Sequence, residues 1–133
     1  MPPVQEPTFV SAIIALSAYQ SAAGMICLLE CPDYLVVPKV PFEHVGIAVY
    51  IEATDGLGDW LYEVRLVHAE TEVPIAPPVG LNLKFEDPTK MAKALLRISP
   101  LKVLQPGSYR LQACHKDDVR NLRRIDVHVA PQS

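Results

Sequence analysis

The stretch that decides the fold is Leu-Gln-Pro-Gly-Ser-Tyr, residues 104–109, together with the two segments that follow it. Hydrophobic and polar residues alternate over residues 109–113 and again over residues 124–129. A period of two is typical of a β-strand with one buried face. The Pro-Gly pair is a turn signal placed just before the first of these segments. The end of the chain is therefore predicted to form two strands after a tight turn.

Tyr109 has a special place in this pattern because it follows the turn and begins a strand. The arrangement resembles the tyrosine corner of immunoglobulin-like domains, in which a Tyr hydroxyl binds the backbone a few residues upstream. Antibody domains also have a Cys–Trp–Cys core. Here Trp60 follows Asp59 in a predicted turn, and the cysteine spacing does not fit that core. We expect an immunoglobulin-like sandwich without the antibody core.

Proline marks the ends of the predicted strands elsewhere in the chain. It supplies 13 of 133 residues, which is twice its usual share of about 5%. Proline cannot donate a hydrogen bond to a sheet and is excluded from central strands. The long proline-free windows are residues 8–31, 42–73, 89–99 and 107–130. These windows are where strands are expected.

Alternation and turn signals divide these windows. Residues 45–51, 62–66 and 79–85 each have a period of two. Residues 21–24 are predicted to form the turn of a hairpin in the first window. Residues 92–98 also alternate, although the composition of that segment suits a helix as well. The prediction is an all-β chain, an immunoglobulin-like antiparallel β-sandwich of about seven to nine strands.

Length and composition indicate a single domain. Residues 8–130 are predicted to form the sandwich, with flexible ends at residues 1–7 and 131–133. Half of the residues are hydrophobic and 20% are charged, which excludes a disordered chain. The net charge of −3 argues against nucleic acid as a partner, because duplex binding requires a basic surface.

The cysteine count and one uncharged stretch bear on localisation. The chain contains three cysteines, Cys27, Cys31 and Cys114. Secreted disulfide frameworks have an even number of cysteines at a higher density. Free thiols in the cytoplasm are the simpler interpretation, with a bridge from Cys114 to either other cysteine left open. Residues 7–29 contain no charge, which is long enough to span a bilayer. Polar residues dilute the stretch and no basic segment precedes it, so we expect buried strands and a hairpin rather than a membrane or signal segment.

Residues 8–129 as a whole resemble a family of small bacterial proteins of unknown function with a predicted immunoglobulin-like sandwich. The resemblance is carried by Ala18 with Gly24, by Pro-Lys-Val-Pro at residues 38–41 leading into residues 45–52, by Tyr-Glu-Val-Arg-Leu-Val at residues 62–67, and by residues 106–111. These are structural features. The resemblance implies a fold and supplies no activity.

Motifs for catalysis are missing from the sequence. It has no Gly-x-Ser-x-Gly, no His-Glu-x-x-His and no phosphate-binding glycine loop. Cys27, Cys31, Cys114 and His115 are four potential zinc ligands, but a single Cys-x3-Cys is a weak signal. The acidic residues around the glycine-rich turn at residues 54–59 lack the regular spacing of a calcium loop. We predict no enzyme activity, no metal and no cofactor.

Apolar and aromatic side chains are the most promising functional signal. Residues 34–38 and 74–79 are predicted to be proline-bearing segments at sheet edges, where proline blocks unwanted pairing. Open edges also accept extended peptides, and aromatic residues anchor interfaces. The residues predicted to contact a partner are Tyr50, Trp60, Lys116, Arg120, Arg123 and Arg124.

These observations favour a non-enzymatic binding or scaffolding module in the cytoplasm, which recognises a protein partner or associates with itself. One alternative is a secreted or surface adhesin-like domain, which requires export and a disulfide at Cys114. Another is a small metal-dependent hydrolase, which requires a concave site with converging His, Asp or Glu side chains.

Overall fold

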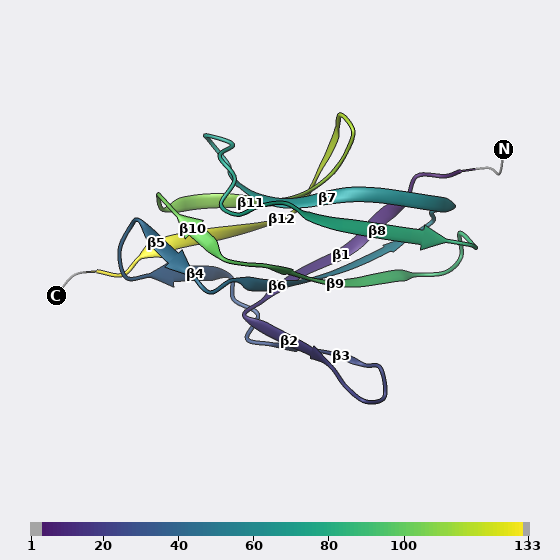
Figure 1. Ribbon diagram of the computed structural model, residues 1–133, viewed down its shortest axis with the longest axis horizontal. Helices are drawn as coiled ribbons and strands as arrows, with labels where there is room; N and C mark the ends of the chain where they lie inside the picture. Colours follow the sequence, from purple (N-terminus) through teal and green to yellow (C-terminus); the bar gives the residue numbers. More distant parts are fainter. Residues whose placement is uncertain (1–3, 132–133) are drawn as a thin grey trace.

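The computed structural model describes residues 4–131, and every helix or strand assigned in that range is a β-strand (Figure 1). The all-β prediction is therefore confirmed. The strands are β1 (Thr8–Ala15), β2 (Ser17–Gln20), β3 (Ile26–Leu29), β4 (Tyr34–Val37), β5 (Phe42–His44), β6 (Ile47–Thr54), β7 (Gly58–His68), β8 (Val79–Phe85), β9 (Ala92–Ile98), β10 (Leu101–Val103), β11 (Gly107–His115) and β12 (Asp118–Val129).

The described residues form twelve strands, more than the seven to nine expected. One cause is subdivision, since Leu16 alone separates β1 from β2. Another is that β5 and β10 are only three residues long and pair with each other in a small sheet of their own. The helix considered for the segment after Pro88 is wrong. Ala92–Ile98 is β9, and it pairs with β6 along its whole length, so pairing with a neighbouring strand overrides local helix propensity.

Two larger sheets face each other and enclose the core (Figure 1). The five-stranded sheet has the order β4-β12-β11-β7-β8, and the three-stranded sheet has the order β1-β6-β9. Tyr62, Leu66 and Leu111 from the larger sheet belong to the same buried cluster as Ile14 and Ile51 from the smaller sheet. The alternation in the sequence correctly predicts which face of β7, β8 and β11 is buried, because the hydrophobic residues of these strands point into the core.

The strand pairing departs from the prediction at one edge. β4 runs parallel to β12, with Leu35 beside Val127 and Val37 beside Val129. All remaining strand pairs of the described residues are antiparallel, as predicted. β4 nevertheless lies at the sheet edge, as expected for this short segment. A parallel pair requires a long crossover, and here most of the chain lies between the two strands.

β6 is buried on both faces, which its sequence pattern does not reveal. Ala48 and Tyr50 are buried together with Val49 and Ile51. Val45, the expected start of the buried alternation, precedes β6 and is 76% exposed. Both edges of β6 are paired, one with β1 and the other with β9, and β2 also contacts this strand.

The predicted tyrosine corner is present. The Tyr109 hydroxyl donates to the Gln105 carbonyl oxygen at 2.6 Å, and the His68 ring packs edge-on against the buried Tyr109 ring at 5.0 Å between centroids. Gly107 has φ +129°, and a Cβ at this position would lie 2.9 Å from His68 Nε2. Glycine is therefore needed where the chain passes His68.

The predicted turn at residues 21–24 joins β2 and β3 in a hairpin. The Gly24 N–H donates to the Ser21 carbonyl oxygen at 2.9 Å, and the Ser21 N–H donates to the Met25 carbonyl oxygen at 2.8 Å. With Gly24 at φ +84°, this is a three-residue loop closed by a glycine bulge. The hairpin projects away from the two layers in Figure 1. The expectation that residues 7–29 form buried strands is wrong here, because Tyr19, Met25 and other hairpin residues are exposed.

The predicted flexible ends lie partly outside the described residues, which exclude residues 1–3 and 132–133. Within residues 4–7, Gln5 forms an antiparallel bridge with Leu57 through two backbone hydrogen bonds of 3.0 and 2.9 Å. No helix of sufficient length and hydrophobicity to cross a membrane occurs among residues 4–131.

Candidate functional site

The six residues predicted to contact a partner do not form one site. Tyr50 lies on β6 and is only 8% exposed. Its hydroxyl donates to Glu52 Oε1 at 2.5 Å. Burial, together with the Glu52 carboxylate, raises the pKa of Tyr50 to about 12. Tyr50 therefore serves the sandwich itself and presents little surface to a partner.

Trp60 lies on β7, and its predicted place in a turn is wrong. The strand begins at Gly58, so the glycine-rich turn ends earlier than its sequence suggests. The Trp60 indole Nε1 donates to the Leu57 carbonyl oxygen at 3.1 Å. Its ring packs on Tyr62 at 6.4 Å and on His115 at 5.1 Å between centroids. Trp60 is half-buried in this aromatic group.

Arg120 and Arg123 join the two sheets, and we call this pair the arginine clasp. Arg120 forms ion pairs with Glu6 and Asp118. Its Nη1 donates to the Pro7 carbonyl oxygen at 3.0 Å. Arg123 Nη1 donates to a carbonyl oxygen of β1 at 3.3 Å. The clasp thus connects β12 to β1 and to the segment just before it, and Arg123 supplies a donor to the backbone of β1.

Lys116 lies at the tip of the β11–β12 hairpin, beside an open hollow of about 510 Å³. The hollow is lined by Glu6, Trp60, His115, Lys116, Asp117, Asp118 and Arg120. Acidic and basic groups are mixed in it, which is typical of a solvated charged surface. No group of three or more His, Cys, Asp or Glu side chains within residues 4–131 is arranged to hold a metal ion.

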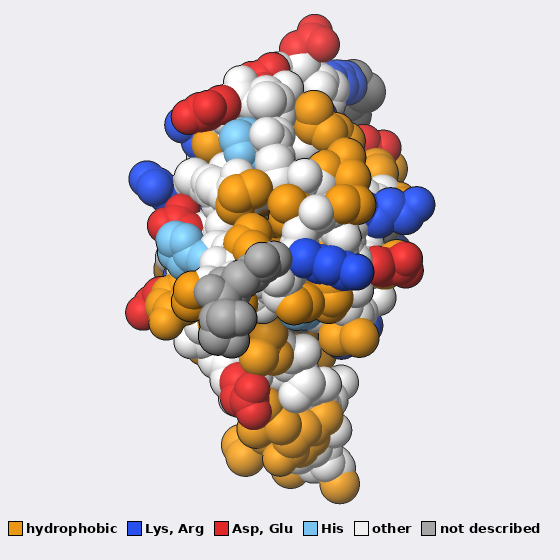
Figure 2. All heavy atoms as spheres, turned by 90° about the vertical axis from the view of Figure 1, so that its left-hand side faces the viewer, with side chains coloured by type: hydrophobic (Ala, Val, Ile, Leu, Met, Phe, Trp, Pro, Cys, Tyr) orange, Lys and Arg blue, Asp and Glu red, His pale blue; other side chains and the backbone are white. Residues whose placement is uncertain are grey.

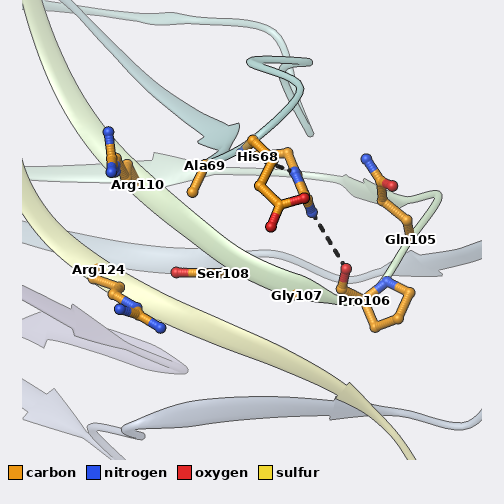
Figure 3. A pocket seen from close by; sticks show the side chains of 9 residues that line it. His68, Ala69, Gln105, Pro106, Gly107, Ser108, Arg110 and Arg124 are labelled. Carbon is orange, nitrogen blue, oxygen red and sulfur yellow. Dashed lines mark hydrogen bonds between the residues drawn. The ribbon is translucent and has the colours of Figure 1, made fainter.

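Arg124 lines a second hollow of about 390 Å³, next to the tyrosine corner (Figure 3). His68 at its wall uses both ring nitrogens. Nδ1 accepts from the Glu70 N–H at 3.2 Å, and Nε2 lies 3.3 Å from the Pro106 carbonyl oxygen. Nδ1 is therefore the acceptor, and Nε2 carries the proton. A histidine held in this way ties the loop after β7 to the turn before β11.

The cations of this second hollow do not converge. Arg110 and Arg124 are opposite each other on β11 and β12, but Figure 3 shows their side chains pointing in different directions. Arg124 Nε is 3.2 Å from Asp126 Oδ1. The hollow therefore lacks the paired geometry with which arginines bind an anion.

The three cysteines are unpaired thiols. Cys27 lies on β3, Cys31 follows that strand, and Cys114 lies on β11. Burial raises the pKa of the Cys114 thiol, which opposes the thiolate form that a nucleophile requires. The bridges left open by the sequence do not form.

The β2–β3 hairpin carries the most coherent exposed apolar surface. Tyr19 is 53% exposed, Met25 is 65% exposed and Leu29 is 47% exposed. Tyr19 is opposite Cys27, and Ser17 is opposite Leu29. Opposite residues, and residues two apart along a strand, point to the same face. We call the surface formed by Tyr19, Met25, Cys27 and Leu29 the hairpin face.

Two further observations concern the hairpin face. The Cys27 thiol beside Tyr19 raises the pKa of the Tyr19 hydroxyl, so the two side chains lie together. Figure 2 shows hydrophobic side chains covering much of the narrow lower end of the molecule, where the hairpin projects. Sequence reasoning missed this surface, although the absence of charge in residues 7–29 was its signal.

Residues 10–130 match a family model described as a family of unknown function, DUF6941. The chain belongs to DUF6941. The resemblance to an uncharacterised family is thereby confirmed. The DUF6941 match contains both larger sheets almost entirely and the whole of the β2–β3 hairpin. No curated protein and no solved structure matches the chain.

Proposed function

We propose that this DUF6941 protein is a non-enzymatic binding module that docks onto protein through its β2–β3 hairpin. The observation that carries the proposal is the hairpin face, an uncharged apolar surface on two short strands that project from the sandwich. Isolated two-stranded hairpins are marginally stable in water. Exposed apolar patches on soluble proteins mark interaction sites.

The side chains of the hairpin face suit a protein interface. Aromatic residues and Met are enriched at interface cores, and charged residues are depleted there. Tyr19 and Met25 fit this composition, and Leu29 extends it. Each is about half exposed, so covering each one contributes roughly 1 kcal/mol at 25 cal/mol per Å² of apolar surface. Recognition would rest on shape and apolar burial rather than on charge.

The polar side chains elsewhere on the protein support a catalytic function less well than the hairpin face supports docking. His68 uses both ring nitrogens within the fold, and Arg120 is held by Glu6 and Asp118. These groups are positioned for structure. They do not form the nucleophile, base and orienting group that a hydrolase assembles.

The proposal also includes the type of sandwich, the bacterial origin and the cellular location of the protein. We propose that the two sheets are a variant of the immunoglobulin-like sandwich, which the hydrogen bond from Tyr109 to Gln105 supports. We also propose a bacterial cytoplasmic protein. The unpaired thiols of Cys27, Cys31 and Cys114 favour a reducing compartment over the adhesin-like alternative.

Site-specific photo-crosslinking in the native cell tests the docking function. A photoreactive phenylalanine replaces Tyr19, and the matched control replaces Tyr34, which is 54% exposed on β4. We expect a discrete adduct from position 19 that mass spectrometry identifies as a protein and that re-forms with purified components. Position 34 should give none. Equal crosslinking from both positions, or none from position 19, would contradict the proposal.

A further inference from the structure

We infer that the hairpin binds a second copy of this chain, with β3 of each copy pairing antiparallel about a two-fold axis. The inference rests on the proposed docking function and names its partner. The result would be a continuous four-stranded sheet in the order β2-β3-β3-β2. A lone hairpin is marginally stable, and a sheet needs three or more strands with a hydrophobic face to be stable by itself.

Protection of the other edge strands supports the choice of β3. Unpaired edges attract other chains, and proteins protect them with charges, prolines or covering groups. Arg123 donates to the Ala12 carbonyl oxygen of β1, and Arg120 donates to the Pro7 carbonyl oxygen just before that strand. Edge strand β8 contains Lys84, and edge strand β9 contains Lys93 and Arg97.

Three further short strands are protected in the same way: β4 is followed directly by Pro38, and β5 and β10 contain Glu43 and Lys102. The two strands of the hairpin have no such protection. β2 and β3 contain neither a charge nor a proline. The main approach of the hairpin to the sandwich is between β2 and β6. β2 is therefore the hairpin strand nearer the sandwich, and the second edge of β3 pairs with no other strand of residues 4–131.

The hydrogen-bond pattern of the hairpin identifies the groups on this outer edge. The Ser21 N–H bonds to the Met25 carbonyl oxygen. Hydrogen-bonded and non-hydrogen-bonded pairs alternate along an antiparallel ladder. Cys27 therefore directs its N–H and C=O toward β2. Ile26 and Leu28 direct theirs to the outer edge.

This pattern fixes the register of the proposed pair. Ile26 and Leu28 carry the outward groups, so they must face outward groups of the second copy. The register with the greatest overlap sets Ile26 opposite Leu28 of the second copy. Cys27 then lies opposite Cys27 of the second copy, as a non-hydrogen-bonded pair in which side chains approach most closely. Met25 lies opposite Leu29 of the second copy.

Charge also favours a second copy. Each chain carries a net charge of −3, so the association of two copies carries a weak net repulsion between like charges. The stretch of residues 7–29 contains no charge, and the register above opposes only apolar or thiol side chains. Two-fold pairing of identical surfaces is the commonest form of association. The hairpin is a surface on which copies of this acidic chain can meet without like-charge contact.

Sedimentation velocity over a wide concentration range tests the association. We expect the wild-type mass to double as concentration rises. Leu28→Pro removes an outward N–H and leaves the β2 ladder intact, so this variant should stay monomeric. The matched control is Ala18→Pro, because Ala18 is opposite Leu28 and directs its N–H to the other edge of the hairpin. The control should still dimerise, and circular dichroism verifies that both variants are folded.

Oxidation with diamide tests the register. Two Cys27 thiols in contact should give a disulfide-linked dimer, with their two hydrogens passing to diamide. Cys27→Ser should abolish this dimer, while Cys31→Ser and Cys114→Ser should retain it. Linkage through Cys31 or Cys114 instead would overturn the proposed pairing.

The two proposals fail in different ways. A wild-type protein that stays monomeric at every concentration overturns self-pairing. If position 19 still crosslinks to a different protein in cells, the docking function survives. If position 19 gives no adduct, the docking function through the hairpin face falls, while self-pairing through β3 is decided by the sedimentation and oxidation experiments. Dimerisation that persists in Leu28→Pro shows a different contact and also overturns the β3 pairing.

Discussion

The Tyr109 hydroxyl donates a 2.6 Å hydrogen bond to the carbonyl oxygen of Gln105, four residues upstream. This bond closes the turn that leads into β11, and both partners lie in the stretch from which the fold was predicted. Tyr109 is 3% exposed, so the bond forms away from water. It connects the turn to the core of the larger sheet.

Tyr109→Phe should lower the free energy of unfolding by about 1–2 kcal/mol, because it removes this bond while preserving the ring. Urea denaturation followed by tryptophan fluorescence measures the change. A stability equal to that of the wild type would show that the corner does not support the fold.

Gly107→Ala should destabilise the protein by about 1–3 kcal/mol. Gly107 has φ +129°, and an added Cβ would lie 2.9 Å from His68 Nε2. Gly80→Ala is the matched control, because no atom lies within 4 Å of an added Cβ at that position. The control should change stability by no more than about 0.5 kcal/mol. Similar melting temperatures for the two variants would refute the close-approach argument.

Arg120→Ala should cost about 1–2 kcal/mol of stability, since it removes a hydrogen bond to Pro7, two ion pairs and a contact with the Phe9 ring. Arg124→Ala provides the comparison. The Arg124 side chain is 70% exposed and pairs only with Asp126 among the carboxylates of residues 4–131, so its loss should cost about 0.5 kcal/mol or less. If both variants lose equal stability, the arginine clasp has no special role.

Alkaline pH should destabilise the protein through Tyr50. Its pKa is raised to about 12 in the folded state, against about 10 in the unfolded chain. The folded state therefore retains this proton more strongly, and the corresponding stability is complete below pH 10 and lost as pH rises toward 12. Between pH 10 and 12 the melting temperature of the wild type should fall more steeply than that of Tyr50→Phe, which has no hydroxyl to ionise at this position. A constant difference between them from pH 9 to 12 would disprove the shift.

Much of the sandwich was predictable because its signals are local. The alternation over β7, β8, β11 and the end of β12 reflects one buried face, and Pro106 with Gly107 marks the turn that Tyr109 closes. β6 does not follow this rule, because Ala48 and Tyr50 on its other face are buried as well.

The roles of the candidate site residues depend on contacts distant in sequence. Arg120 binds Pro7 and Glu6 across more than a hundred residues, and no spacing in the sequence reveals this. The sequence predicts burial for the uncharged segment around Tyr19, because apolar composition alone does not distinguish a core strand from an exposed apolar hairpin.

Concentration-dependent hydrogen exchange tests the central claim, that the hairpin is the surface at which two copies meet, most directly. The amides of Ile26 and Leu28 face the open edge of β3, so they should exchange rapidly in dilute protein and become protected as concentration rises. The amide of Cys27, which faces β2, should change less. Rapid exchange of Ile26 and Leu28 at every concentration would contradict the account.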